Sequence, residues 1–159
     1  MIENRYSDIF CIVDKEEKYG ALREIISSCS VFSSLPESLD KFKASVIRRE
    51  RKQTTDIGHG VAITHGKVPH LERTIIALGF SKKGIVFKEN SDPVHLIFVI
   101  ASPLAPCSDY LQSVAALLSW VHDIEFRKEL GDCSLTNNVK VFLDMLEKKQ
   151  YKTMAKALA

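Results

Sequence analysis

The chain has 159 residues, of which 45% are hydrophobic and 26% charged, and its 22 basic and 20 acidic side chains leave a net charge of +2. These values lie near the globular average and exclude a disordered, collagen-like or coiled-coil chain. The length predicts one domain over residues 1–150, with residues 151–159 as a tail. The nearly balanced charge favours neither nucleic acid nor a membrane surface as a partner.

Neither the N-terminus nor the cysteine pattern indicates secretion. The N-terminal apolar run, Ile9–Val13, is too short for a signal peptide or a membrane span. The four cysteines are widely spaced and form no CxxC motif; they are Cys11, Cys29, Cys107 and Cys133. We therefore expect a cytoplasmic protein with reduced thiols and no direct membrane insertion.

The first third of the chain predicts a strand followed by two helices. Residues 9–13 are apolar and β-prone, which is typical of a buried strand. Asp14 is the expected N-cap of a helix over 15–29, where apolar residues recur at helical spacing. A serine-rich connection leads to a second helix after Pro36, which ends in the basic run Arg48–Lys52.

The middle of the chain changes to patterns that favour strands. Val61–Ile63 is a short apolar run that is expected to end as a strand at His65, and a longer strand is expected over 72–80. A turn over 81–84 then leads into another short strand. Residues 94–101 form the most apolar strand of the chain.

Helices are expected over about 109–121, 125–130 and 137–148. Helices at both ends of the chain and strands between them predict an α/β domain of mixed α+β type, with helices packed on a central mixed sheet. A regular βαβ alternation is not predicted.

Most familiar catalytic motifs are absent from the sequence. It contains no GxSxG elbow, no GxxxxGK[ST] loop and no GxGxxG after a strand, so a serine hydrolase or nucleotide-dependent kinase is poorly supported. A metal-dependent hydrolase built on His59, His65 and His70 is the lowest-ranked alternative, because the three lack an HExxH pattern. We expect no metal and no cofactor.

Residues 49–67 read RERKQTTDIGHGVAITHGK. This block resembles the pattern RE…sTgIGxGxAIPHgk of the type-2 IIA domains of the phosphoenolpyruvate-dependent phosphotransferase system, which include fructose, mannitol and nitrogen-regulatory branches. Residues 92–103, DPVHLIFVIASP, are similar to the family's D.pV.l.f.l..P strand. The resemblance covers about residues 8–148 and implies a mannitol/fructose IIA-type fold, a mixed sheet sandwiched by helices.

The resemblance implies that His65 accepts a phosphoryl group and that Arg49 stabilises it. In this family the group comes from the phosphohistidine of an HPr-type carrier, and the sugar-transport branches pass it to a cysteine of a IIB domain. The residue types suit that chemistry. A neutral imidazole offers a lone pair near pH 7, and a guanidinium offers a fork of donors to phosphate oxygens.

Further candidates for contact with the phosphate or with a partner are Thr55, Gly58, Gly60, Thr64, Gly66 and Tyr110. For the glycines, plain turn formation is an equal alternative. Three positions depart from the family pattern: Thr64 replaces a proline, Asp56 a glycine, and Tyr110 the histidine of an HL pair in many relatives. Tyrosine can donate a hydrogen bond to phosphate but cannot share a proton near pH 7.

The preferred function is a phosphohistidine carrier of the stand-alone, nitrogen-regulatory type, because the sequence shows no IIB cysteine motif and no membrane segments. The first alternative is a IIA subunit of a fructose- or mannitol-type permease. The second is a binding module that keeps the fold but has lost the phosphorylation cycle. The expected partners are an HPr-type carrier and either a IIB domain or regulatory target proteins.

Overall fold

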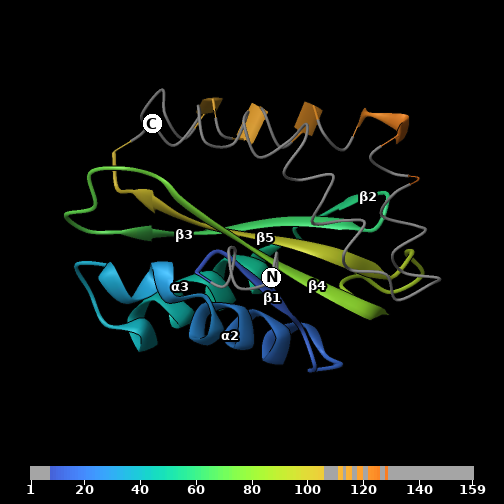
Figure 1. Ribbon diagram of the computed structural model, residues 1–159, viewed down its shortest axis with the longest axis horizontal. Helices are drawn as coiled ribbons and strands as arrows, with labels where there is room; N and C mark the ends of the chain where they lie inside the picture. Colours follow the sequence, from blue (N-terminus) through green and yellow to red (C-terminus); the bar gives the residue numbers. More distant parts are fainter. Residues whose placement is uncertain are drawn as a thin grey trace.

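The computed structural model describes residues 8–105 and, between 111 and 128, residues 111, 112, 114, 115, 118, 119, 122–125 and 128. A mixed five-stranded sheet with the order β1-β4-β5-β3-β2 forms the centre of this part (Figure 1). The strands are β1 (Phe10–Ile12), β2 (Asp56–Gly58), β3 (Val61–Val68), β4 (Ile75–Ile85) and β5 (Val94–Pro103). The β1/β4 and β3/β5 pairs are parallel, whereas β4/β5 and β2/β3 are antiparallel.

Helical segments lie on both sides of this sheet (Figure 1). Three of them lie together on one face: α2 (Lys18–Ser28), the 3₁₀ helix η1 (Ser30–Ser34) and α3 (Leu39–Lys52). The described helical residues between 111 and 128 lie on the opposite side, and all of them except 122 and 124 fall within the helices predicted over 109–121 and 125–130. The predicted helix over 137–148 lies outside the described residues. The predicted mixed sheet with packed helices is confirmed.

The helix α2 begins three residues later than predicted, and its N-cap is not Asp14. The Glu17 carboxylate caps it by accepting hydrogen bonds from the backbone N–H groups of Tyr19 and Gly20. The backbone N–H of Asp14 instead donates to Oε1 of Glu24 at 2.9 Å. This bond holds residue 14 in the loop before the helix, so the next suitable acidic side chain takes the cap.

The apolar side of α3 was predicted correctly. Ser38 caps its N-terminus by accepting a hydrogen bond from Lys41 N–H at 3.2 Å, and Phe42, Val46 and Ile47 are buried. The serine-rich connection before it contains η1. Its apolar residue Phe32 is fully buried, with its ring centroid 5.0 Å from that of Phe42, so packing orders this segment.

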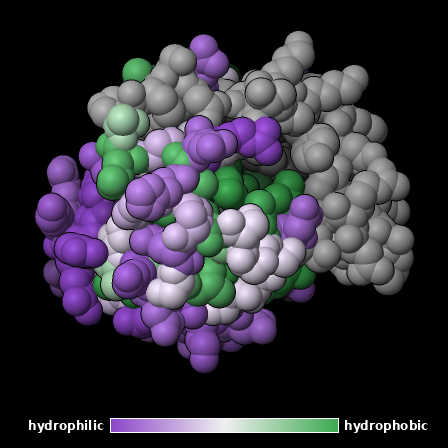
Figure 2. Space-filling view, turned by 90° about the vertical axis from the view of Figure 1, so that its left-hand side faces the viewer, coloured by the Kyte–Doolittle hydropathy of each residue, from purple (hydrophilic) through white to green (hydrophobic). Residues whose placement is uncertain are grey.

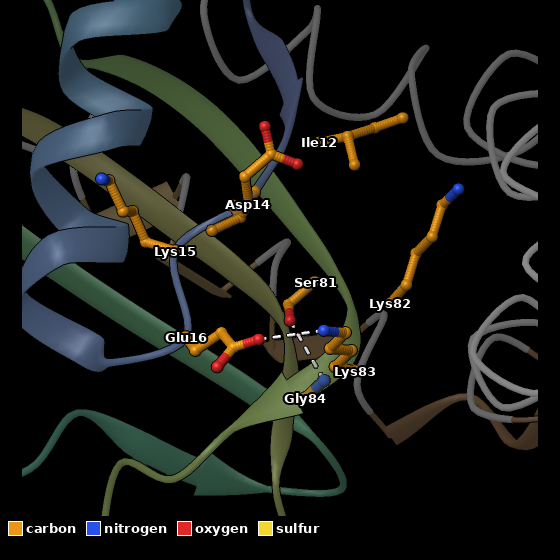
Figure 3. A pocket seen from close by; sticks show the side chains of 9 residues that line it. Ile12, Asp14, Lys15, Glu16, Ser81, Lys82, Lys83 and Gly84 are labelled. Atoms are coloured by element: carbon orange, nitrogen blue, oxygen red, sulfur yellow. Dashed lines mark hydrogen bonds and ion pairs between the residues drawn. The ribbon is translucent and has the colours of Figure 1, made fainter.

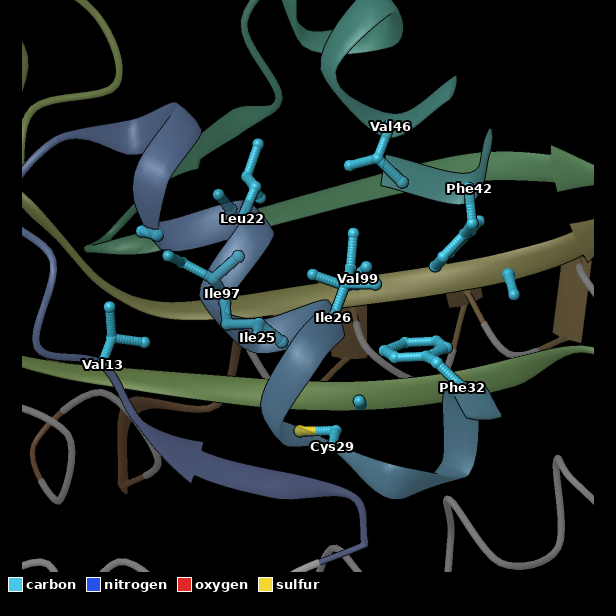
Figure 4. Close-up of a cluster of buried hydrophobic side chains, with 14 of the residues drawn as sticks. Val13, Leu22, Ile25, Ile26, Cys29, Phe32, Phe42, Val46, Ile97 and Val99 are labelled. Carbon is cyan, nitrogen blue, oxygen red and sulfur yellow. The ribbon is translucent and has the colours of Figure 1, made fainter. Parts of the chain in front are cut away.

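The main hydrophobic core lies between the sheet and the layer of α2, η1 and α3 (Figure 4). Side chains at helical spacing on α2 meet alternate residues of the strands; the cluster includes Leu22, Ile25, Ile26, Phe32, Phe42, Val46, Ile97 and Val99. Burial of each large apolar side chain stabilises the fold by about 1.5–3 kcal/mol relative to exposure. Close approach of α2 also requires Gly79, because a Cβ there would collide with Ile25.

Two strands are longer than the sequence pattern indicated. β3 does not end at His65 but continues to Val68, so His65 lies within the strand. β4 runs through the predicted turn at 81–84, with a register irregularity between Phe80 and Ile85. In that irregular segment Gly84 has φ 85°, and its N–H donates to the Ser81 hydroxyl at 3.0 Å.

The end of the molecule that carries the β3–β4 connection shows hydrophobic side chains lying between hydrophilic ones (Figure 2). Within the described part of the chain, no helix combines the length and apolar character needed to cross a membrane.

Candidate functional site

The half-buried His65 lies within β3, where its register partner is Ile100 of β5. The residue after it shows which way its side chain points. A Cβ on Gly66 would lie 3.0–3.1 Å from side-chain atoms of Phe42, Ser45 and Val46, so position 66 faces α3. Successive side chains of a strand point to opposite faces, and His65 therefore points to the face of the sheet away from α3.

The electrostatic environment keeps the His65 ring neutral. Partial burial lowers the pKa of His65 below its usual value of 6.5, and the positive charges of Arg49 and Lys67 lower it further. Burial disfavours the charged imidazolium, and nearby cations do the same by repulsion. The side chain therefore presents a lone pair at neutral pH, with two cations close enough to act on it.

Arg49 reaches this environment from the last turn of α3. Its Nη1 donates a hydrogen bond to the carbonyl oxygen of Gln53 at 2.8 Å. Cationic side chains near helix C-termini often bind the last free carbonyls in this way. One part of the guanidinium is thus anchored while its charge acts on His65.

Thr55 lies next to the site, but its hydroxyl is already engaged. It donates to Oε2 of Glu50 at 2.5 Å, and the Thr55 N–H donates to the same oxygen at 3.0 Å. The carbonyl of Thr55 accepts the N–H of Ile63 at 3.1 Å. In this arrangement Thr55 connects α3 to β3 and does not direct its hydroxyl proton to a ligand.

Gly58 and Gly60 form the tight turn between β2 and β3. Their φ angles are 90° and 77°, and His59 between them has φ 58°. Such left-handed backbone is accessible to glycine without strain, so turn formation accounts for both. The Gly60 carbonyl accepts the N–H groups of His95 and Leu96 at 2.8 and 3.1 Å, which holds the turn against the start of β5.

Another predicted residue, Thr64, is not brought to the His65 side chain. Thr64 is completely buried and, as its neighbour in the strand, points to the opposite face. Among the described residues its hydroxyl has no hydrogen-bond partner. Tyr110 lies outside the described residues.

The three histidines of the metal alternative do not gather in one place. His59 lies in the β2–β3 turn and His70 follows β3, both exposed and both with positive φ. Across residues 8–105 and the described positions up to 128, no group of three or more His, Cys, Asp or Glu side chains is arranged to hold a metal ion.

Sequence reasoning gave no role to Lys67 or Glu50. Lys67 is exposed on the same strand two residues after His65, so the alternation of strand side chains places both on one face. Glu50 is 2% exposed, although it interrupts a basic run that is typical of a solvated helix end. A single acid among four cations was the available signal that Glu50 has a specific partner.

A pocket of about 200 Å³ lies elsewhere, between the β1–α2 connection and residues 81–84 (Figure 3). Its surface carries an ion pair between Lys83 Nζ and Glu16 Oε1 at 2.9 Å. Both side chains are largely exposed, so the pair contributes little to stability. None of the predicted site residues lines this pocket.

Solved structures share this fold. The nitrogen regulatory protein IIA-Ntr from Neisseria meningitidis superposes with a TM-score of 0.68 at 24% identity, over 78% of this chain and 84% of that one. Mannitol IIA from Escherichia coli superposes with a TM-score of 0.67 at 19% identity, over 88% of this chain and 96% of that one. A structure of that enzyme with phosphorylated IIB of the mannitol system has a TM-score of 0.67 at 18% identity, over 90% of this chain and 96% of that one.

Curated relatives come from sugar and nitrogen systems. A fructose-specific EIIABC component of Bacillus subtilis is 28% identical over 74% of this chain but only 19% of its own length. A nitrogen regulatory protein of Bradyrhizobium diazoefficiens is 33% identical over 54% of this chain and 56% of its own. A fructose-specific EIIA component of Haloferax volcanii is 30% identical over 77% and 80%.

The chain thus spans about a fifth of the length of the Bacillus subtilis relative and about half of the length of the Bradyrhizobium diazoefficiens relative. A family model covers nearly all of it: that of the phosphoenolpyruvate-dependent sugar phosphotransferase system, EIIA 2, matches residues 7–147. The chain belongs to this type-2 EIIA family.

Proposed function

We propose that this protein is a phosphohistidine carrier, in which His65 accepts a phosphoryl group from the phosphohistidine of an HPr-type protein. The observation that carries the proposal is the half-buried imidazole of His65, whose pKa is lowered by burial and by Arg49 and Lys67. In the transfer, the N–P bond of the donor breaks as an N–P bond to the His65 ring forms. The nucleophile must be the neutral ring, which is the form that this environment favours.

The two cations suit the other half of the reaction. The transferred group spreads negative charge over its three equatorial oxygens in a loose transition state. Arg49 offers planar donors to such oxygens, and Lys67 offers a mobile ammonium on the same face as His65. The charges that disfavour an imidazolium at His65 also favour a phosphoryl group there.

We infer a regulatory role in preference to sugar uptake, although relatives of both kinds are found. Support for this preference comes from Tyr110, which stands where many type-2 IIA domains have a second histidine. A phenol can hold a phosphate oxygen but cannot relay a proton near pH 7, so onward transfer to a IIB cysteine is expected to be slow. A IIB-type protein is the alternative partner, as in the mannitol complex.

The test is incubation with phosphoenolpyruvate, enzyme I and HPr, followed by intact mass. We expect one added phosphoryl group that is labile in acid and stable in base. His65→Ala should abolish it, whereas His59→Ala, His70→Ala and His95→Ala should keep it. Labelling that survives His65→Ala would overturn the site, and a wild-type protein that takes no label would support the binding-module alternative.

A further inference from the structure

Glu50 is a carboxylate in the interior of the protein. It lies in the last turn of α3, and its side chain has no exposed surface. A charged group removed from water is costly unless it is paired and hydrogen-bonded. The partners of Glu50 therefore indicate what it is there to hold.

Both oxygens of this carboxylate are used. Oε2 accepts the N–H of Thr55 at 3.0 Å and its hydroxyl at 2.5 Å. Oε1 lies 3.3 Å from Nζ of Lys18, which also donates to the carbonyl of Phe87 at 2.9 Å. The carboxylate thereby joins the start of α2, the end of α3 and the connector between α3 and β2.

That connector, residues 53–55, is bonded to the Arg49 side chain and to the strand that carries His65. The Arg49 guanidinium donates to the carbonyl of Gln53 at 2.8 Å. The carbonyl of Thr55 accepts the N–H of Ile63 at 3.1 Å, two residues before His65 in β3. The orientation of the connector therefore influences where Arg49 lies relative to His65.

We propose that Glu50 is a positioning residue for phosphoryl transfer, whose buried carboxylate fixes the connector that holds Arg49 beside His65. This inference rests on the function proposed above. Glu50 does not need to touch the phosphoryl group, and it is not among the groups whose charge shifts the pKa of His65. Its effect is exerted through Thr55 and the connector.

The test is Glu50→Gln, which keeps the size of the side chain but removes its charge and places an amide near Lys18. With purified phosphorylated HPr as donor, we expect phosphorylation of His65 to slow about 10- to 100-fold, as for other losses of alignment near a reacting group. The pKa of His65, followed by NMR titration, should rise towards its ordinary value as Arg49 moves away. Direct loss of a nearby negative charge would lower that pKa, so the two effects have opposite signs.

Glu24→Gln is the matched control, because Glu24 is also a helix carboxylate that holds loop backbone, through the N–H groups of Asp14 and Lys15. It should leave both the rate and the pKa of His65 unchanged. Thr55→Val is a second variant, which removes only the hydroxyl bond to Glu50. It should slow phosphorylation and raise the pKa of His65 as Glu50→Gln does, but by less. It decides the question if Glu50→Gln does not fold.

An unchanged rate and an unchanged His65 pKa in Glu50→Gln, or in Thr55→Val if that variant alone folds, would overturn the inference while leaving the proposed function intact. A wild-type protein that accepts no phosphoryl group would contradict the proposed function instead. The NMR titration then decides the role of Glu50 without the reaction.

Discussion

The two faces of β3 differ in what surrounds their side chains. On the face towards α3 every side-chain position is buried; these positions are Ala62, Thr64, Gly66 and Val68. On the other face exposure increases along the strand, from half-buried Ile63 and His65 to exposed Lys67. One strand thus has a packed side, which fixes its backbone, and an accessible side, which carries the candidate chemistry.

This difference shows how a strand can hold a nucleophile in place without a rigid loop. The backbone of His65 is fixed by register with Ile100 and by the contact between Gly66 and α3. Sites built on such elements are more precise than those on loops. Substitutions on the packed face should therefore change stability, whereas those around the accessible face should change the rate.

Among variants that keep His65, the largest effect on the phosphorylation rate is expected from Arg49→Ala. Loss of one preorganised donor at a charged transition state typically slows a reaction about 100- to 1000-fold. The rate of Arg49→Lys should lie between those of the wild-type protein and Arg49→Ala, because lysine keeps the charge but loses the planar fork of donors. Single-turnover transfer from phosphorylated HPr measures the rate, and thermal unfolding checks that the fold is intact. An unaltered rate would show that Arg49 does not act on the phosphoryl group.

The packed face is tested by Gly66→Val. Even a Cβ at this position lies 3.0 Å from the side chain of Val46, and the larger side chain has no free space towards α3. Overpacking of this kind typically destabilises a protein by about 1–3 kcal/mol. Urea unfolding measures the loss. Lys67→Val, the matched change on the accessible face, should cost far less stability, and equal losses would remove the distinction between the faces.

Thr64→Val lies on the same face as Gly66→Val but should change stability in the opposite direction. The Thr64 hydroxyl is fully buried and has no partner in the part of the chain that the structure describes. Replacing it with a methyl group of similar shape removes an unpaired polar group, which should stabilise the fold by about 1 kcal/mol. Urea unfolding measures this as well. A loss of stability would mean that the hydroxyl has a hydrogen-bond partner. Slower phosphorylation would show that Thr64 takes part in the site, as the sequence predicts.

The sequence was sufficient for the elements whose signals are local. Phe42 and Val46 lie four residues apart on the apolar side of α3, and Ser38 supplies its cap, so both the helix and its buried face were predictable. Continuous apolar runs likewise marked β5. The resemblance directed attention to His65, and the fold it implied is confirmed.

The features that were missed depend on distant partners. β3 continues past His65 because β5 pairs with it as far as Pro103, although Gly66 and Lys67 are poor local strand signals. Glu50 is buried because Lys18, 32 residues earlier in the chain, supplies its counter-charge. Tertiary contacts of this kind leave no periodic pattern in the sequence.

The smallest effect is expected from Lys67→Gln, which removes a charge from the accessible face while keeping most of the side chain. Lys67 lowers the pKa of His65 by repelling an imidazolium, so its loss should raise that pKa and protonate His65 at a higher pH. At pH 8 the ring is neutral in both proteins, and the rate should fall only two- to fivefold, as an exposed cation–anion contact is worth about 0.2–1 kcal/mol. Below pH 6.5 the difference in rate between the wild-type protein and the variant should widen. The reason is that His65 of the variant is protonated at a higher pH and so loses its neutral form first. Lys82→Gln, a neutralised exposed lysine of β4, is the control. A gap that stays constant with pH, together with an unshifted His65 titration, would show that Lys67 does not act on the imidazole.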